Sequence, residues 1–219
     1  MFKDREAAGE ALAERLECYR GARDVLVLGL PRGGVITASA ISKRLGLPLD
    51  VLVSQKLRCP DDPELAFGAV TELGNAYFDP RLAPLVKPAE RDEELAFERK
   101  EALWRRRLYR GDRPLPDVRG RRLILVDDGI ATGATFIAAI EALRTVAPGR
   151  IVAAAGVGQT DVVKTVAAMA DETQVVEVLE ELEVVGACFE SFPPLHDWEV
   201  VARLSAGHAR RMRNRGKEE

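Results

Sequence analysis

The sequence predicts an α/β protein in which helices flank a parallel β-sheet. Short runs rich in apolar residues, typical of strands that are buried on both faces, recur along the chain: VLVLGL at 25–30, LILVDD at 123–128 and RIVAAAGVG at 150–158. Segments with helical periodicity lie between these runs, so that strands and helices alternate. This alternation favours parallel strands that are joined by right-handed crossovers.

The N-terminal part supplies the first β-α-β unit. The expected elements are, in order, a helix over 4–20, a strand over 25–30, a helix over 35–46 and a strand over 49–57. The first helix places Ala8, Leu12 and Leu16 on one face. The second helix closes with Gly46, a residue type that commonly ends helices. The sequence PRGG forms the turn between the first strand and the second helix.

Residues 58–121 are predicted to be an insertion. The stretch 58–85 is rich in Pro, Asp and Gly, and within it AVTEL and NAYFDP could pair as a hairpin. We expect residues 58–80 to be a flexible loop that can close over a site. The sequence then predicts a strongly charged helix over 88–110 and a loop up to residue 121. The arginine cluster at 105–107 indicates a solvated or partner-facing helix rather than contact with nucleic acid.

The C-terminal part continues the alternation of strands and helices. The expected elements are a strand over 123–128, a helix over 132–149, a strand over 150–158, a helix over 161–171 and a strand within 174–185. The rest reads as a loop, a short helix and a solvated basic tail with Arg210, Arg211, Arg213 and Arg215. We therefore expect a single domain over 1–219, with its core at about 20–57 and 122–180, the insertion at about 58–121 and a C-terminal segment at about 181–219.

The composition limits the classes of partner. Lys and Arg total 32 and Asp and Glu total 35, so the formal charge of −3 gives no support to bulk nucleic-acid binding. The three cysteines form no CxxC pair, which disfavours a zinc site and a disulfide framework. The charged N-terminus lacks a secretory apolar core, and no apolar run is long enough to span a membrane. We therefore expect a cytoplasmic protein without nucleic-acid or membrane partners.

The segment LILVDDGIATGATFIAAI carries the strongest functional signal. Four apolar residues deliver Asp127 and Asp128 to the carboxyl end of a strand, where open α/β sheets bind ligands. The small residues that follow run into a helix, so that backbone N–H groups, the hydroxyls of Thr132 and Thr135 and the helix dipole can face one anion. This combination suits a ligand with both hydroxyls and a phosphate, and the carboxylates can also hold a hydrated Mg²⁺.

Two other phosphate-binding patterns do not fit this chain. An apolar strand that ends in two acids also occurs in P-loop NTPases, but the GxxxxGK[ST] loop that such a site requires is missing from the sequence. A dinucleotide site requires GxGxxG after a strand, and Gly29, Gly33 and Gly34 have a different spacing. The plain structural alternative is an ordinary β-α turn with a capping threonine.

The segment LILVDDGIATGAT at 123–135 resembles the 5-phosphoribosyl-1-pyrophosphate (PRPP) motif of type I phosphoribosyltransferases. The resemblance implies that Asp127 and Asp128 contact the ribose hydroxyls and hold Mg²⁺ through water and substrate. It places the 5′-phosphate on the loop that follows, which consists of Gly129, Ile130, Ala131, Thr132, Gly133, Ala134 and Thr135.

Two further stretches match the same family in order. Its first strand ends in a pyrophosphate loop, often with a cis peptide bond, and this loop corresponds to Pro31, Arg32, Gly33 and Gly34. Its second strand leads into a catalytic loop that often begins with basic residues, here Lys56 and Arg58. The resemblance implies catalytic roles for Arg32, Lys56, Arg58 and Asp128. The segment YRGDRP at 109–114 is similar to one in bacterial members of unassigned acceptor.

The resemblance implies transfer of the phosphoribosyl group from PRPP to a nitrogenous acceptor, expected to be a nucleobase, with release of pyrophosphate and a requirement for Mg²⁺. The alternatives are a non-catalytic PRPP-binding regulator and an enzyme that acts on another phosphosugar, and a homodimer is left open. Ala131 stands where hypoxanthine-guanine enzymes carry an Asp, which disfavours a 6-oxopurine acceptor.

The family places its acceptor under a variable hood, and the segment 186–200 is the candidate here. Its candidate residues are Phe189, Phe192, Pro193, Pro194, His196 and Trp198. An aromatic ring among them could stack on a base, or the aromatic residues could simply pack the hood against the core. His196 is a conceivable base near neutral pH and is otherwise a surface or capping residue.

Overall fold

In the computed structural model the described part of the chain is residues 1–215, without the side chains at 63–64, 208 and 210–215. The side chains of the predicted basic tail (Arg210, Arg211, Arg213 and Arg215) therefore lie outside the described part. The strands are β1 (Val25–Gly29), β2 (Leu49–Val51), β3 (Ser54–Cys59), β4 (Asp62–Thr71), β5 (Ala76–Phe78), β6 (Arg122–Ile130), β7 (Arg150–Gln159) and β8 (Glu172–Leu179). The α-helices are α1 (Arg5–Arg15), α2 (Gly33–Leu45), α3 (Pro88–Arg110), α4 (Ala134–Arg144), α5 (Thr160–Met169) and α6 (Asp197–Arg215).

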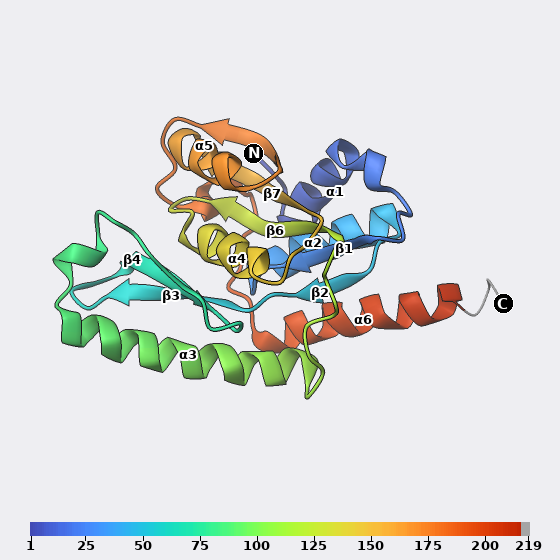
Figure 1. Ribbon diagram of the computed structural model, residues 1–219. Coiled ribbons are helices and arrows are strands. Elements are labelled where there is room, and N and C mark those ends of the chain that lie inside the picture. The colour runs from blue at the N-terminus through green and yellow to red at the C-terminus, as the bar shows by residue number, and fades with distance from the viewer. Residues whose placement is uncertain (216–219) are drawn as a thin grey trace.

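The central sheet has 5 strands in the order β2-β1-β6-β7-β8, and every pairing is parallel. Helices α1 and α2 pack on one face, and α4 and α5 pack on the other (Figure 1). Successive residues of a strand point to opposite faces, so Val25 and Val27 face α1 and α2 whereas Leu26 and Leu28 face α4. This arrangement confirms the predicted α/β fold with a parallel sheet.

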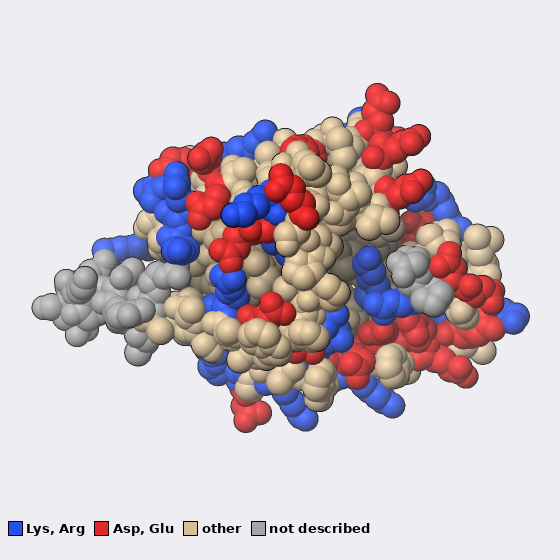
Figure 2. Space-filling model, turned by 180° about the vertical axis from the view of Figure 1, so that it is seen from behind, with Lys and Arg blue, Asp and Glu red and all other residues tan. Residues whose placement is uncertain are grey.

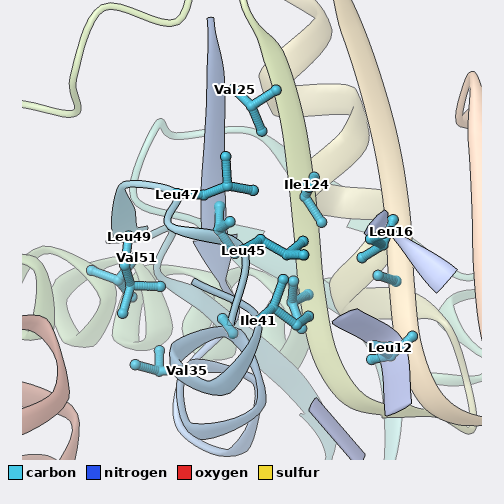
Figure 3. Close-up of a cluster of buried hydrophobic side chains, with 14 of the residues drawn as sticks. Leu12, Leu16, Val25, Val35, Ile41, Leu45, Leu47, Leu49, Val51 and Ile124 are labelled. Carbon is cyan, nitrogen blue, oxygen red and sulfur yellow. The ribbon is translucent and has the colours of Figure 1, made fainter. Parts of the chain in front are cut away.

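The core beneath α1 and α2 is built mainly from branched aliphatic side chains. Figure 3 shows Leu12 and Leu16 of α1 and Ile41 of α2 packed near Ile124 of β6. All four of these side chains are fully buried. Because the strands are covered on both faces, their sequences are continuously apolar, which is the pattern from which the fold was predicted. No helix in the described residues is long and apolar enough to cross a membrane.

The single strand predicted over 49–57 was wrong, because these residues form two strands in different sheets. The N–H of Leu52 still donates to the backbone of β1, at 3.1 Å. The N–H of Val53 instead donates to the carboxylate of Glu72, at 2.9 Å. The chain therefore leaves the central sheet at this point, and β3, β4 and β5 form an antiparallel sheet of their own.

The segment 58–80, expected as a flexible loop, consists largely of strands. The pairing of β4 with β5 confirms the hairpin predicted from AVTEL and NAYFDP. The expectation of a loop was wrong because apolar side chains of this segment and of β3, among them Leu57, Phe67 and Val70, are buried in a small core beside α3. The Pro, Asp and Gly residues that suggested a loop lie between and around these buried positions.

Helix α3 has the predicted bounds and runs along β3 and β4 to reach α6 (Figure 1). At its last residue, Nη1 of buried Arg110 donates to the carbonyl oxygen of Val51 at 2.8 Å, and Nη2 bonds to the carboxylate of Glu72. The hydroxyl of Tyr109 donates to Asp197, the first residue of α6. The YRGDRP segment therefore ties the insertion to β2 and to α6, which is longer than the short helix expected.

Candidate active site

A cleft of about 420 Å³ opens at the carboxyl edge of the central sheet. Its walls come from the loop after β1, from β3, from the end of β6 with the start of α4, and from the segment after β8. On the face drawn in Figure 2, Lys and Arg side chains gather at a hollow, and Asp and Glu side chains cover the adjoining end of the molecule. The cleft is lined by Arg5, Pro31, Arg32, Gly33, Ser54, Gln55, Lys56, Arg58, Arg105, Asp127, Asp128, Gly129, Ala131, Thr132, Gly133, Thr135, Glu183, Val184, Val185, Gly186 and Phe192.

The two acids of the predicted motif stand where β6 runs past the end of β1. The last pairing of these two strands joins Gly29 to Val126, so Asp127 and Asp128 lie just beyond it. The backbone N–H of Asp128 donates to Oδ1 of Asp127 at 2.9 Å. Burial and the neighbouring charge of Asp128 raise the pKa of Asp127 well above its usual value, and nearby Lys56 opposes this effect. Asp127 and Asp128 thus form a partly desolvated pair of hydrogen-bond acceptors, with the cationic side chain of Lys56 nearby.

The loop after β1 brings Arg32 into the cleft wall. Its Pro31–Arg32 peptide bond is cis, as the resemblance implied. Helix α2 begins directly after this loop, at Gly33. A Cβ atom on Gly33 would stand 1.9 Å from Oδ2 of Asp128, so a residue without a side chain is required for the loop to approach the acids.

The loop after β6 presents Thr132 and Gly133 to the cleft, and the first turn of α4 presents Thr135. Gly133 has a φ of 73°, and a Cβ atom there would stand 2.6 Å from Val162, so both its conformation and its packing require glycine. As the residue before α4, Gly133 makes no side-chain cap. The first backbone N–H groups of α4 are therefore not occupied by a side chain of Gly133 and can bind an anion.

Not every residue of the predicted motifs reaches the cleft. Gly34, Ile130 and Ala134 are buried and do not line it. The side chain of Ile130 belongs to the core beneath α4, and that of Ala134 packs with Ala69 of β4. Gly34, Ile130 and Ala134 therefore support the two loops from the core side, and the residues next to them form the surface of the cleft.

Strand β3 carries the two predicted basic residues of the opposite wall. Lys56 is exposed and lines the cleft. Nη1 of Arg58 lies 3.2 Å from Oε1 of Glu98, and the backbone N–H of Arg58 donates to Glu94 at 2.9 Å. Arg58 is therefore tied to α3, and Glu98 compensates part of its charge before any ligand binds.

Two arginines of the cleft were not predicted as site residues. Arg5 of α1 donates to Oδ2 of Asp128 at 2.8 Å, across 123 residues of sequence, and no local pattern indicates such a contact. Arg105 of α3 lines the cleft and lies 3.9 Å from Asp197, a position that the interpretation of 105–107 as part of a solvated or partner-facing helix did not include. A signal for Arg105 existed, because it lies three residues after buried Ala102 and four before buried Tyr109, on the inward face of the helix.

Phe192 is the aromatic residue of the hood that lines the cleft. The guanidinium carbon of Arg5 lies 3.5 Å from the centroid of its ring. Gly186 packs so closely against the ring that a Cβ atom would stand 2.9 Å from Cδ1 of Phe192. The ring is therefore held by the protein itself in this structure, and is not presented as an open platform for a base.

The remaining hood candidates have other positions. Phe189 is buried and contacts both Phe2 and Phe192. Pro193, Pro194, His196 and Trp198 do not line the cleft, and the backbone N–H of His196 donates to Glu199 as α6 begins. Besides Phe192, residues 183–186 after β8 line the cleft, and of these only Gly186 belongs to the candidate segment 186–200.

The acids can hold a metal only with help from other ligands. Within the described residues, no group of three or more His, Cys, Asp or Glu side chains could hold a metal ion. Oδ1 of Asp127 accepts a backbone N–H, and Oδ2 of Asp128 accepts Nε of Arg5, so one oxygen of each carboxylate is engaged. Such a donor set fits Mg²⁺ that keeps several waters and binds phosphates of the substrate.

Comparison with known proteins agrees with this geometry. A family model described as "Phosphoribosyl transferase domain" matches residues 3–186. Rv0571c of Mycobacterium tuberculosis, named as a phosphoribosyl transferase, is 39% identical over 215 residues, which cover 95% of this chain and 47% of that protein. The chain thus spans about half the length of the curated relatives it matches. The crystal structure of TT1426 from Thermus thermophilus has a TM-score of 0.76 at 37% identity and covers 93% of this chain and 97% of that one.

Proposed function

This chain belongs to the phosphoribosyl transferase domain family, and we propose that it transfers the 5-phosphoribosyl group of PRPP to a nitrogenous acceptor of the nucleobase class, with release of pyrophosphate. The observation that carries the proposal is that two acids, an anion-binding helix start and a group of basic side chains meet in one cleft. The cleft is lined by five basic side chains (Arg5, Arg32, Lys56, Arg58, Arg105) and three acidic ones (Asp127, Asp128, Glu183). This excess suits a small substrate that carries several phosphates.

In the proposed complex the parts of PRPP bind to different walls. The start of α4, with Thr132 and Thr135, binds the 5′-phosphate through hydroxyls and backbone N–H groups. Asp127 and Asp128 accept hydrogen bonds from the ribose hydroxyls. Arg32 on the loop after β1 faces the pyrophosphate, as does Lys56 on β3.

The proposed reaction breaks the bond from C1 of the ribose to the pyrophosphate oxygen and forms a bond from C1 to the acceptor nitrogen, which gives up its proton. Positive charge develops on the ribose ring beside Asp127 and Asp128, and negative charge develops on the departing pyrophosphate beside Arg32 and Lys56. Side chains that already face these charges lower the barrier, because they need no reorganisation during the reaction. Mg²⁺, held by the two acids through water and substrate, would supply further positive charge to the pyrophosphate.

A turnover assay tests this proposal. The protein is incubated with PRPP, Mg²⁺ and a panel of nucleobases, and pyrophosphate release is followed. We expect release with at least one base, and a loss of about 10²-fold or more when Asp127→Asn and Asp128→Asn are combined. Asp161→Asn is the matched control, because Asp161 is an exposed acid of α5 that pairs with Lys164 and does not line the cleft.

The outcomes separate the candidate functions. PRPP binding without turnover on any base would favour the non-catalytic regulator over the enzyme. Release of pyrophosphate at the same rate with and without a base would favour hydrolysis. A protein that binds no PRPP, or a double variant as active as the wild type, would contradict the proposed function and the assignment of the acids.

A further inference from the structure

Arg5 joins parts of the cleft that lie far apart in the sequence. Its Nε donates to Oδ2 of Asp128 at 2.8 Å, and its Nη1 donates to the carbonyl oxygen of Pro193 at 3.0 Å. Its Cζ atom lies 3.5 Å from the centroid of the Phe192 ring. One guanidinium therefore contacts an acid at the end of β6 and two consecutive residues of the hood.

The contact between Arg5 and Asp128 is shielded from water. The side chain of Arg5 is 9% exposed, and that of Asp128 is 15% exposed. Charges enclosed in this way interact more strongly than charges in water, and removal of one leaves the other without compensation. The planar guanidinium can donate in two directions while a ring packs against its face, which a lysine ammonium cannot do. The direction of the Asp128 carboxylate therefore depends on Arg5.

The hood is attached to the segment that leads into Arg5. The N–H of Phe2 donates to the carbonyl oxygen of Cys188 at 2.8 Å, and the N–H of Glu190 donates to the carbonyl oxygen of Phe2 at 2.8 Å. Arg5 then begins α1, and its side chain extends this connection to Asp128. The N-terminal segment, the hood and the acid of β6 thus form one connected unit.

We propose that Arg5 is a positioning residue, which orients Asp128 for the ribose hydroxyls and, through the same guanidinium, holds the hood against the cleft. The inference rests on the proposed function, because it takes Asp128 as a ligand of the ribose. Two consequences follow. First, loss of Arg5 weakens ribose binding, because Asp128 is no longer oriented, even though Arg5 itself does not contact the ribose. Second, the same loss loosens the attachment of the hood to the cleft.

Calorimetry with two partial ligands tests the first consequence. Ribose 5-phosphate and inorganic pyrophosphate are titrated separately, with Mg²⁺, into the wild type, Arg5→Gln and Arg15→Gln. Arg15 is a matched control, because it lies on the same helix and donates to the backbone oxygens of Val175 and Val176 away from the cleft. We expect Arg5→Gln to weaken ribose 5-phosphate binding about tenfold, to change pyrophosphate binding less than about twofold, and Arg15→Gln to change neither.

A double variant separates positioning from direct contact. If Arg5 acts through Asp128, adding Arg5→Gln to Asp128→Asn weakens ribose 5-phosphate binding no further. Additive losses would show that Arg5 contacts the ligand itself and would overturn the positioning role. For the second consequence, we expect hydrogen exchange of the amides at 188–192 to be faster in Arg5→Gln than in Arg15→Gln or the wild type. Equal exchange in all three would overturn the role in the hood.

This inference and the proposed function fail in different ways. A wild type that binds neither ribose 5-phosphate nor pyrophosphate contradicts the proposed function. A wild type that binds both, with unchanged binding in Arg5→Gln, contradicts the inference alone. If Arg5→Gln does not fold, the variant Arg5→Lys is measured in its place. It keeps the charge but lacks the planar guanidinium, whose donors point to Asp128 and Pro193 in fixed directions while Phe192 packs on its face. Wild-type affinity for ribose 5-phosphate in Arg5→Lys would overturn the inference, and weaker binding would support it.

Discussion

Gly33 lies so close to Asp128 that a Cβ atom on the glycine would stand 1.9 Å from Oδ2 of the carboxylate. Gly34 makes a different contact, because its Cβ atom would stand 2.4 Å from the carbonyl oxygen of Val126, inside β6. The first glycine therefore borders side chains alone. The second borders the backbone of β6 most closely, and its Cβ atom would also stand 2.9 Å from Oδ1 of Asp127. The loop after β1 and the acids of β6 fit together only because both positions lack a side chain.

Alanine at the two glycines should therefore have different effects. We expect Gly33→Ala to displace the Asp128 carboxylate and weaken ribose 5-phosphate binding about tenfold or more, because the obstructed group is a side chain that can move. We expect Gly34→Ala to lower the free energy of unfolding by about 1–3 kcal/mol, because the backbone it meets cannot move easily. Calorimetric titration and urea unfolding of both variants check this.

Gly207→Ala is the matched control for these substitutions. Gly207 is also in a helix, and its Cβ atom would stand 3.4 Å from that of Leu49, an ordinary contact. Alanine there should leave ligand binding unchanged and stability unchanged or higher, since alanine is favoured over glycine in helices. Wild-type ribose 5-phosphate binding in Gly33→Ala would contradict the inferred fit between the loop and the acid.

The features that the sequence predicted well are those that depend on neighbouring residues. Buried parallel strands such as β6 are apolar throughout, and the small residues after Asp128 mark the turn into α4, so both could be read locally. The cleft then follows from topology, because parallel strands bring their carboxyl ends to one edge. Pro31 and Arg32 therefore line the same cleft as Asp127 and Asp128, although they are about 95 residues away in the sequence.

The features that were missed depend on contacts between distant segments. The bond from Arg5 to Asp128 spans 123 residues, and periodicity within α1 carries no trace of it. The chain leaves the central sheet after Leu52 because the carboxylate of Glu72 receives the next amide, from Val53. Neither event changes the local pattern of apolar residues, so a strand over 49–57 was the natural interpretation.

A second prediction concerns Arg105, which the insertion brings into the cleft. Arg105 lies 3.9 Å from Asp197, which also accepts the hydroxyl of Tyr109. Burial and the bond to Asp197 raise the pKa of Tyr109, whereas the charges of Arg105 and Arg32 lower it. Because both guanidiniums act on the same hydroxyl, Arg105 and Arg32 lie in the same part of the cleft. We expect Arg105→Gln to weaken inorganic pyrophosphate binding about tenfold and to leave ribose 5-phosphate binding unchanged.

Arg107→Gln is the control for Arg105→Gln, because Arg107 is exposed on the same helix and does not line the cleft. Calorimetry with Mg²⁺ measures both ligands in both variants. Equal affinities for pyrophosphate in Arg105→Gln and Arg107→Gln would exclude a role of α3 in binding the leaving group. An equal loss for both ligands in Arg105→Gln would point to a general disturbance of the cleft.

A third prediction concerns the buried ion pair that anchors the insertion. Nη2 of Arg110 bonds to the carboxylate of Glu72, and both side chains are 1% exposed. Arg110→Met leaves that carboxylate buried without its partner, so we expect a loss of about 3–5 kcal/mol in the free energy of unfolding. Adding Glu72→Met should restore part of this loss, because it removes the unpaired charge, although the Val53 N–H and the Val51 carbonyl lose the partners that the pair supplied. Urea unfolding measures the effect, and a double variant as unstable as Arg110→Met would show that the pair is not the cause.

The last prediction concerns the pH dependence of stability at the turn after β5. Burial alone would raise the pKa of Asp79, but bonds from the backbone N–H of Arg81 at 2.8 Å, from its guanidinium and from the N–H of Leu82 at 3.2 Å together lower it. A carboxyl whose pKa is lower in the folded state stabilises the protein above its unfolded pKa, and the effect is lost as the pH falls through the folded value.

We therefore expect Asp79→Asn, which keeps the shape of the side chain but does not titrate, to lower the free energy of unfolding by about 1 kcal/mol relative to the wild type near pH 7. The gap should close below about pH 4. Urea unfolding across this range checks it, and a gap that stays constant or widens in acid would mean that the charge of Asp79 does not stabilise the turn.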